Sequence, residues 1–384
     1  MRRARINIVG GGIGGLCAAL ALRRAGFEPQ VFEQAPELLE IGAAIAVWPN
    51  AMRVLRRLGL GEEVEGRGGV LKYARWIERT GRDFKHFPLP ETGAPSVALH
   101  RAGLQSALVR ALPPDSIHLG RAFQGFSQSG DEVEARFDDG ASEASDVLIC
   151  ADGLHSRARA QIVGDGPPVY RGYTVWRGIT RLEHAALQAH TAMEVYGAGR
   201  RFGIGPVGLG RTGWWATANE PEGVTETSSE HREKLLRLFD GWCAPVVELI
   251  EATPSEKILR TATYDRPHAK RWGEGRVTLL GDAAHPLTPN LGQGGCMAIE
   301  DAAVLARCLA KYDDAALALR AYESHRRART ARVAAYSRRY GAVGQLDGAL
   351  AVRLRGALMS SVPESVGRRL LRLVFDYDAF GVEV

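Results

Sequence analysis

Cysteine, lysine and long apolar runs are scarce in this chain of 384 residues. The five cysteines, at positions 17, 150, 243, 296 and 308, form no C-x-x-C pair and no metal-ligand spacing. Their scarcity argues against a disulfide framework or a metal centre and favours a reducing, cytoplasmic location. No apolar run reaches the roughly 20 residues that a membrane-spanning helix needs. We therefore expect a soluble cytoplasmic protein without a membrane partner.

A strong charge of either sign is also missing. The net charge is +5, with 45% hydrophobic and 24% charged residues, which is ordinary for a globular protein. The densest basic run, HRRARTAR at 325–332, falls in a helical segment and is interpreted as a solvated face. These features favour a protein without a nucleic-acid partner. The length predicts two cores in one chain, as a monomer or a homodimer.

The N-terminal stretch combines a short strand, a glycine-rich turn and a helix. The sequence RINIVGGGIGGLCAALALRRAGFEPQVFEQA predicts a strand at Ile6–Val9, then Gly10-x-Gly12-x-x-Gly15, a helix, and a second strand ending at Glu33. Such glycines allow a tight turn and let the backbone approach a pyrophosphate, which the helix N-terminus attracts. An acidic residue at the position of Glu33 can bind a ribose hydroxyl. The pattern predicts a dinucleotide site.

A second glycine pattern, GIGPVG at 203–208, is not interpreted as a nucleotide site. Pro206 falls where the first turn of a helix would be needed, and no apolar helix follows. The flanking RRF and RTGWWATA favour a hairpin instead. FDDGAS at 137–142 is likewise predicted to be a hairpin turn because of its Asp-Gly pair.

A longer motif, GDAAHPLTPNLGQGGCMAIEDA at 281–302, joins a predicted strand to a predicted helix. Asp282 ends the strand, where a carboxylate can bind sugar-like hydroxyls. The glycine-rich helix start at 293–295 can stabilise negative charge. A flavin offers both targets, because its ribityl chain carries hydroxyls and its reduced ring is anionic. The motif therefore predicts a site for the reactive half of FAD.

Two further segments complete a family pattern. ADGLHSRAR at 151–159 gives D-G-x-x-S-x-x-R, and IGAAIAVWPNAMRVLRRLGL at 41–60 predicts a tight Gly-Ala-Ala turn and a helix capped by Asn50. In this order and spacing the motifs resemble the group A flavoprotein monooxygenases, the para-hydroxybenzoate hydroxylase family, over residues 5–345. Within that family they are most similar to bacterial FAD-dependent urate hydroxylases and to salicylate and hydroxynicotinate hydroxylases.

The resemblance implies an α/β fold: a Rossmann-like FAD-binding domain of the glutathione-reductase type with an inserted, mainly β substrate domain. The FAD-binding domain would span 1–70, 97–165 and 271–345, and the substrate domain 71–96 and 166–270. A C-terminal helical segment would span 346–384.

The resemblance also implies FAD as a bound cofactor and NADPH or NADH as its reductant. Oxygen would form a flavin C4a-hydroperoxide that hydroxylates a small aromatic or heteroaromatic substrate. Arg101 would reach the FAD phosphates and Asp282 the ribityl chain, while the segment around Asp152 would affect nicotinamide use. The full set of implied cofactor-binding residues is Gly10, Gly12, Gly14, Gly15, Glu33, Ala44, Arg101, Asp152, Asp282, Gly292, Gly294 and Gly295.

The expected substrate-binding residues are Arg201, Trp214, Trp215 and Asn290, with Arg201 also the candidate catalytic residue. The urate enzymes carry an acid where Asn290 stands and a tyrosine near Gly213, and the hydroxynicotinate enzymes carry a histidine where Ala46 stands. These departures predict that urate is not the substrate and favour a larger, less polar ring such as an indole or a phenol.

Other reactive side chains receive structural interpretations. His155 and His285 are expected to pack or to bind backbone groups, because this hydroxylation needs no fixed histidine base. Cys296 follows two glycines but has no evident activating base, so we expect it to pack a helix.

Two alternatives to a hydroxylase remain open at this stage. One is a flavin epoxidase or an isoprenoid double-bond reductase of the same fold. The other is a non-catalytic scaffold that holds FAD or a ligand. Oxygen consumption with NAD(P)H separates a monooxygenase from a reductase, and a scaffold predicts no ligand-stimulated NAD(P)H oxidation.

Overall fold

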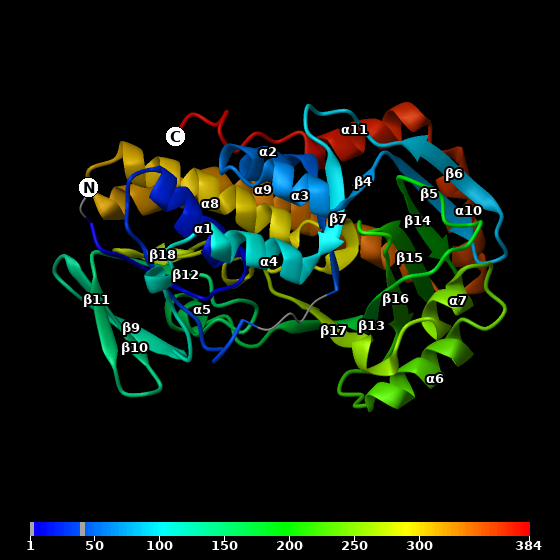
Figure 1. Cartoon of the computed structure of the whole chain (residues 1–384), viewed down its shortest axis with the longest axis horizontal. Helices are drawn as coiled ribbons and strands as arrows, with labels where there is room; N and C mark the ends of the chain where they lie inside the picture. The colour runs from blue at the N-terminus through cyan, green and yellow to red at the C-terminus, as the bar shows by residue number, and fades with distance from the viewer. Residues whose placement is uncertain (1–3, 39–42) are drawn as a thin grey trace.

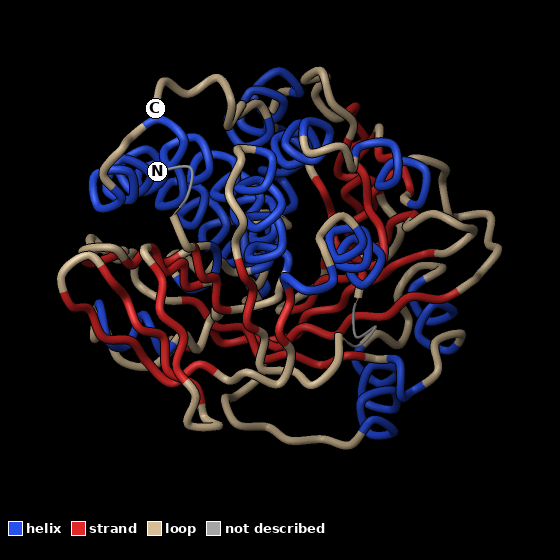
Figure 2. The backbone as a smooth tube through the Cα atoms, turned by 60° about the vertical axis from the view of Figure 1, so that its left-hand side comes forward, coloured by secondary structure: helices blue, strands red, loops and turns tan. Residues whose placement is uncertain are grey.

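The computed structural model describes residues 4–38 and 43–384. A parallel sheet with its helices forms one half of the elongated molecule, and a larger sheet forms the other half (Figure 1). Two long helices, α8 (Gly294–Lys311) and α9 (Ala315–Gly344), lie over the parallel sheet, and α9 extends toward the larger sheet. Figure 2 shows most helices above a nearly continuous layer of strands. This is the mixed α/β architecture that the sequence predicts.

The parallel sheet carries the N-terminal motif. Within the described residues its strand order is β18-β19-β12-β1-β2-β8, and all neighbouring strands are parallel except the β18-β19 pair. Strands β1 and β12 are buried along their whole length, as expected for apolar runs covered on both faces. The bounds are β1 (Ile6–Val9), β2 (Gln30–Phe32), β8 (Ile117–His118), β12 (Val147–Cys150), β18 (Gly273–Glu274) and β19 (Val277–Leu279). Helix α1 (Ile13–Arg24) follows β1 and packs beside α8.

A smaller antiparallel sheet confirms one predicted turn. It consists of β9 (Phe123–Ser129), β10 (Glu132–Phe137) and β11 (Ser142–Ser145). The β10-β11 hairpin turns at the predicted Asp-Gly pair, where Gly140 has a φ of +80°. The short helix α5 (Arg157–Ile162) contacts β9.

The larger sheet confirms the strands expected around the rejected glycine pattern. Its order is β17-β13-β16-β15-β14-β5-β6, and β15 and β16 form the predicted antiparallel hairpin across GIGPVG. Helices α6 (Ser228–Leu238) and α7 (Val246–Glu251) pack on one face of this sheet (Figure 1). The strand bounds are β5 (Tyr73–Glu78), β6 (Asp83–Pro88), β13 (Val169–Thr180), β14 (Thr191–Tyr196), β15 (Arg200–Pro206), β16 (Thr212–Asn219) and β17 (Leu259–Asp265).

A third sheet, β3-β7-β4, joins the two halves. Its strands are β3 (Ala44–Val47), β4 (Gly69–Leu71) and β7 (Ser96–His100), and its neighbours are α2 (Pro49–Arg57), α3 (Gly61–Arg67) and α4 (Arg101–Arg110). The predicted Asn50 cap is wrong: Trp48 is the N-cap of α2 and Pro49 occupies its first position. Asn50 is buried instead and donates to Gln293 and Glu300. The predicted Gly-Ala-Ala turn begins outside the described residues.

The basic run at 325–332 is not a solvated face throughout, so that interpretation is wrong. Arg326 is fully buried and pairs with Glu300 at 2.7 Å and Asp301 at 2.6 Å, while Arg329 pairs with Glu300 at 3.0 Å. The i,i+3 spacing places both arginines on the face of α9 that packs against α8. A buried ion cluster therefore joins the two long helices.

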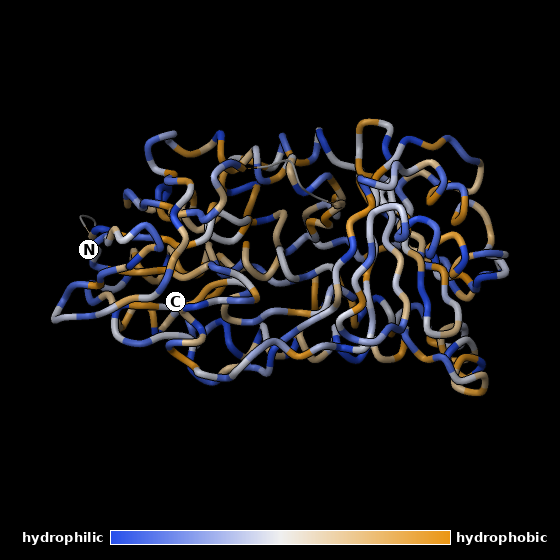
Figure 3. Tube along the Cα trace, turned by 90° about the horizontal axis from the view of Figure 1, so that it is seen from below, coloured by the Kyte–Doolittle hydropathy of each residue, from blue (hydrophilic) through white to orange (hydrophobic). Residues whose placement is uncertain are grey.

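The C-terminal segment is helical, as predicted, with α10 (Ala349–Ser361) and α11 (Glu364–Phe375). Among the described residues, no helix is long and apolar enough to cross a membrane. Figure 3 shows hydrophobic and hydrophilic segments alternating over short distances in both halves of the molecule.

Candidate active site

The glycine-rich turn between β1 and α1 leaves an open space in front of the helix. A Cβ on Gly10, whose φ is +104°, would lie 2.2 Å from the carbonyl oxygen of Ala151, and one on Gly15 would lie 1.9 Å from that of Gly10. These two glycines are required by close packing. A Cβ on Gly12 would meet no atom within 4 Å, and the first turn of α1 holds no acidic residue. The helix N-terminus can therefore receive an anionic group there.

Glu33 follows β2 as predicted, and its carboxylate is held by the same turn. It accepts hydrogen bonds from the backbone N–H of Gly11 at 2.6 Å and of Ala35 at 3.0 Å. Gln105 of α4 adds a hydrogen bond to the carbonyl of Gly11 at 3.0 Å. Glu33 thus shapes the turn, and its contact with a ribose remains a prediction.

The D-G-x-x-S-x-x-R segment builds the start of α5. Asp152 accepts hydrogen bonds from the Ser156 hydroxyl at 2.6 Å and from the backbone N–H of Arg157 at 2.9 Å. Its carboxylate is therefore already used to orient the helix. Arg159 ends this segment, and its side chain is fully buried.

Arg159 ties this segment to the 281–302 motif. Its guanidinium donates to the carbonyl oxygens of Ala283 at 3.1 Å and Ala284 at 2.7 Å, and pairs with Asp165 at 2.6 Å. Two motifs that lie far apart in the sequence are thereby fixed to one another. The position of this arginine at the end of D-G-x-x-S-x-x-R was the sequence signal that could have indicated its role.

The turn after β19 presents Asp282 to a cavity. Gly281 starts the turn with a φ of +62°, and its N–H donates to Asp301 of α8 at 3.0 Å. Among the described residues, no side chain or backbone group forms a hydrogen bond or an ion pair with the Asp282 carboxylate. Desolvation by the surrounding chain raises the pKa of Asp282, against the opposing charges of His285 and Arg101. The carboxylate is thus available to a ligand.

The N-terminus of α8 lines the same cavity. Gly292, Gly294 and Gly295 all face it, and Gly292 has a φ of +60°. A Cβ on Gly292 would approach the Trp48 indole nitrogen to 2.9 Å, and one on Gly295 would approach the Ile45 side chain to 2.9 Å. The first turn of this 18-residue helix contains no acidic residue. The cavity is therefore bordered by backbone that carries no side chains and by the positive end of the helix dipole.

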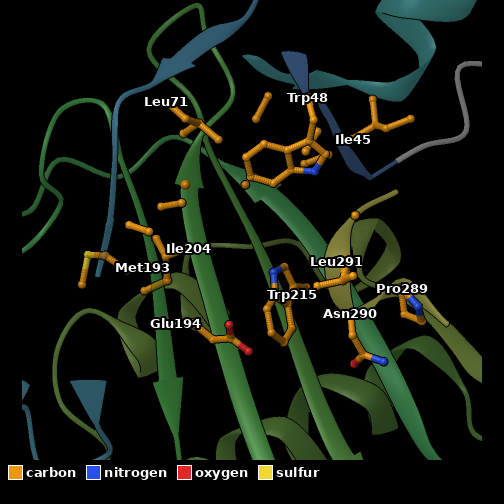
Figure 4. A pocket seen from close by; sticks show the side chains of 18 of the residues that line it. Ile45, Trp48, Leu71, Met193, Glu194, Ile204, Trp215, Pro289, Asn290 and Leu291 are labelled. Carbon is orange, nitrogen blue, oxygen red and sulfur yellow. The ribbon is translucent and has the colours of Figure 1, made fainter. Parts of the chain in front are cut away.

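The cavity has a volume of about 450 Å³ and lies between the α8 N-terminus and the larger sheet. In Figure 4, Trp48, Ile45 and Leu71 lie on one side of it, while Glu194, Trp215 and Asn290 converge on the other. Its walls are mainly apolar. They include Ala44, Ala46, Trp76, Phe87, Leu89, Val175, Val207, Leu287, Leu291, Leu371 and Phe375.

A polar cluster closes one end of the cavity, here called the floor: Glu194, Arg201, Asn290, Tyr340 and Gln345. The Arg201 side chain is 1% exposed and donates to Gln345 at 2.9 Å, to Glu194 at 2.9 Å and to Asn290 at 2.6 Å. Burial alone would lower the pKa of Arg201, but the Glu194 carboxylate and neighbouring phenols raise it. Arg201 therefore stays charged, and each of its three nitrogens donates to a protein acceptor.

Two glycines of α9 let the floor lie against the helix backbone. A Cβ on Gly344 would lie 2.7 Å from the Cδ atom of Arg201, and one on Gly341 would lie 2.3 Å from the Nδ2 atom of Asn290. Neither glycine has a positive φ, so glycine is needed at these positions because the Arg201 and Asn290 side chains lie close to the helix backbone.

The structure separates the two neighbouring tryptophans that were predicted to bind substrate. Trp215 faces the cavity, with its ring 5.3 Å from the Arg201 guanidinium carbon. The indole of Trp214 points to the opposite face of β16, where it donates to Thr253 at 2.9 Å and stacks on Phe202. Successive strand residues face opposite sides of a sheet, so the two indoles lie on opposite faces of β16. Trp214 is also among the residues that line the cavity, and its contact with a substrate stays a prediction.

His285 and Cys296 have the structural roles expected of them, whereas His155 does not pack in the core. His285 is buried, and its Nε2 lies 2.5 Å from Asp301. Cys296 packs against β3, with its Sγ 3.4 Å from the Ala46 carbonyl, and burial raises its pKa to about 12. His155 is exposed at the surface.

These observations fit FAD. The open space at Gly12 suits a pyrophosphate, the unpaired Asp282 suits ribityl hydroxyls, and the α8 N-terminus suits the electron-rich edge of a flavin. Arg101 begins α4 and lies close enough to influence the charge of Asp282. The cavity beyond Asp282 is lined mainly by apolar side chains.

The fold and this site define a flavin-dependent oxygenase. The family described as FAD binding domain matches residues 3–337, and the chain belongs to this family. It is a FAD-dependent monooxygenase of the aromatic hydroxylase type.

Relatives of known activity are similar over most of the chain. The aurachin C monooxygenase/isomerase of Stigmatella aurantiaca is 42% identical over 92% of this chain and 93% of that enzyme. The FAD-dependent urate hydroxylase of Klebsiella pneumoniae is 37% identical over 83% of this chain and 85% of that enzyme. The crystal structure of Klebsiella pneumoniae HpxO with FAD and uric acid matches with a TM-score of 0.91 and 32% identity, over 97% of this chain and 96% of that chain.

Several cavity residues were not found by sequence reasoning. Glu194 and Tyr340 line the floor, Gln345 supports Arg201 from behind it, and Leu371 and Phe375 bring α11 to the wall. A charged residue inside the apolar strand segment TAMEVY was the available signal for Glu194. The helical tail offered no comparable signal.

Proposed function

We propose that this monooxygenase hydroxylates a neutral, mainly apolar aromatic or heteroaromatic ring, using NADPH or NADH as the reductant. The observation that carries this proposal is the position of the cavity. Asp282 and the α8 N-terminus open directly onto walls of Trp48, Leu71 and Phe87. FAD bound there supplies the oxygen-activating chemistry.

The side chains of this protein would position the ring and exclude water. Apolar walls keep the reacting region dry, which limits side reactions of activated oxygen. The Trp215 indole offers a face for ring stacking, and aromatic pairs gain about 0.5–1.5 kcal/mol beyond area burial. The floor would fix the depth to which the ring enters.

Epoxidation of an isolated alkene is the second candidate. The zeaxanthin epoxidase of Oryza sativa is 36% identical over 79% of this chain, although the match spans only 48% of that enzyme. Aliphatic walls formed by Leu71, Leu89, Val175 and Leu291 would also suit an isoprenoid chain. The two candidates differ in product and share the requirement for oxygen.

The test measures NAD(P)H oxidation and oxygen uptake by the FAD-loaded protein with indoles, phenols and isoprenoid alkenes. We expect one class of ligand to stimulate NAD(P)H oxidation and oxygen uptake in equal amounts. Mass spectrometry should show that this ligand has gained one oxygen atom. NAD(P)H oxidation that reduces an alkene without consuming oxygen would identify a reductase. If no ligand changes either rate, the protein is a scaffold and the proposal fails.

A further inference from the structure

The floor contains a counter-ion for Arg201, the carboxylate of Glu194. Glu194 of β14 and Arg201 of β15 lie on paired strands and on the face of the sheet that lines the cavity. Their side chains meet at 2.9 Å, with 13% of Glu194 and 1% of Arg201 exposed. The pair therefore carries no net charge where an arginine alone would present a cation.

We propose that Glu194 determines substrate charge: it occupies the face of Arg201 that a substrate anion would need, so the cavity accepts neutral rings and rejects carboxylates. The inference rests on the proposed function, because it concerns the ligand of the same cavity. Glu194 is a specificity-determining residue in this view and takes no part in oxygen transfer.

Glu194 is held on both of its oxygens and cannot easily move aside. One oxygen binds Arg201, and the other accepts a hydrogen bond from the Tyr340 hydroxyl at 2.6 Å. The Tyr196 hydroxyl supports Tyr340 at 2.5 Å, and burial together with the charge of Glu194 raises the pKa of both phenols well above its usual range. An entering anion would leave a buried carboxylate unpaired, which is strongly unfavourable.

The other sides of Arg201 are closed as well. Gln345 accepts from its Nε atom and Asn290 from its Nη2 atom, and the Trp215 ring packs beside the guanidinium. A second guanidinium, that of Arg177, also lines the cavity, and it donates a hydrogen bond to the Thr261 hydroxyl at 3.3 Å. Carboxylate binding at Arg177 would be lost in Arg177→Met, so the two sites can be separated by experiment.

The experiment compares matched neutral and anionic rings in the FAD-loaded protein. Indole and indole-2-carboxylate form one pair, and 2-naphthol and 3-hydroxy-2-naphthoate form another. Dissociation constants come from perturbation of the flavin absorbance without turnover. We expect the parent to bind each neutral ring at least about tenfold more tightly than its carboxylate. Glu194→Gln removes the charge, keeps a hydrogen-bond acceptor for Tyr340, and should shift this ratio at least about tenfold toward the carboxylate.

Two controls isolate the charge at the floor. Glu183→Gln removes an exposed acid outside the cavity and should leave the ratio unchanged. Glu194→Leu combined with Arg201→Met replaces the pair by apolar groups, a change that folded proteins often tolerate. This double variant should bind neutral rings and gain no affinity for carboxylates. FAD content and melting temperature identify any variant that has lost its fold.

Two results would overturn the inference. One is a parent protein that binds carboxylates as tightly as neutral rings, which needs no variant at all. The other is a ratio that stays constant in Glu194→Gln while Arg177→Met abolishes carboxylate binding, which would assign anion recognition to Arg177. If the protein turns over these rings but Glu194→Gln leaves the ratio of the two dissociation constants unchanged, only this inference is refuted. The absence of ligand-stimulated oxygen uptake refutes the proposed function.

Discussion

The indole of Trp48 is stacked on the ring of Phe375, with centroids 4.4 Å apart and planes 11° from parallel. Trp48 caps α2 beside the Gly292 turn, whereas Phe375 ends α11, more than 300 residues later in the chain. Both rings line the cavity. The C-terminal helix therefore forms part of the cavity wall, although it lies beyond the residues matched by the family.

Phe375→Ala should enlarge the cavity and lower stability. A buried phenylalanine truncated to alanine costs about 3–5 kcal/mol, and Phe375 is 3% exposed. We expect a lower melting temperature and a relative gain in turnover of bulkier substrates. Leu373→Ala, at an exposed position of the same helix, should change stability by less than about 0.5 kcal/mol. Equal effects of the two substitutions would contradict a wall role for Phe375.

Asp282→Ala should weaken FAD retention without destabilising the protein that lacks FAD. The described structure gives this carboxylate no protein partner, so its loss removes only contacts to a ligand. Unpaired ribityl hydroxyls would cost about 1–3 kcal/mol of binding free energy. Fluorescence titration of FAD, together with denaturant unfolding of the FAD-free protein, separates the two effects. Unchanged FAD affinity would refute the ribityl assignment.

Asp301 should make stability depend on acid pH. Burial alone would raise its pKa, but His285 and Arg326 together lower it to about 2 from the model-peptide value of 3.8. Because the folded pKa is the lower one, this stabilisation is complete above the unfolded pKa and is lost as the pH falls from about 4 toward 2. The shift corresponds to about 2 kcal/mol.

Asp301→Asn tests this dependence by unfolding in urea at a series of pH values. The variant should be about 3–5 kcal/mol less stable at neutral pH, because Arg326 loses a buried partner. Its stability should then fall less steeply than that of the parent between pH 4 and 2. Asp240→Asn, at an exposed site, is the control and should match the parent. Parallel curves for Asp301→Asn and the parent would contradict the expected linkage.

Urate should not stimulate NAD(P)H oxidation by this enzyme, despite its likeness to urate hydroxylases. The Asn290 amide is already bound to Arg201, Tyr173 and Ser337. A Cβ at Gly213 would lie 2.7 Å from the Val207 side chain, so a tyrosine there would require the wall to move. The measurement is urate-dependent oxygen uptake by the parent and by Asn290→Asp. Efficient, stoichiometric turnover by the parent would be the contrary result.

The motifs expected to bind the cofactor through backbone groups could be predicted from the sequence. The glycine turn at 10–15, the strand β1 and the helix α8 follow from residue type and spacing, since few side chains fit these positions. The cavity floor was not predictable in the same way. Arg201 looks unpaired in the sequence, and its neutralisation depends on Glu194 across a strand pair and on Gln345 after α9.

The errors have a common physical cause. Asn50 has a typical capping side chain, but the helix starts at Pro49, two residues earlier than a cap at Asn50 predicts, and Asn50 then faces Glu300. The arginines at 326 and 329 look solvated until α8 supplies Glu300 and Asp301. In each case a contact between distant segments overrides the local preference.

Helix α9 connects the buried ion cluster at one point to the cavity floor at another. Arg326 and Arg329 fix it to α8, and about three to five turns later Gly341 and Gly344 support Asn290 and Arg201. A single residue inserted between these points would rotate the floor by about 100° and shift it by about 1.5 Å relative to the ion cluster. Side-chain substitutions along the intervening exposed face leave that register intact. The length of this segment, more than its composition, is therefore what evolution of a new substrate range has to preserve.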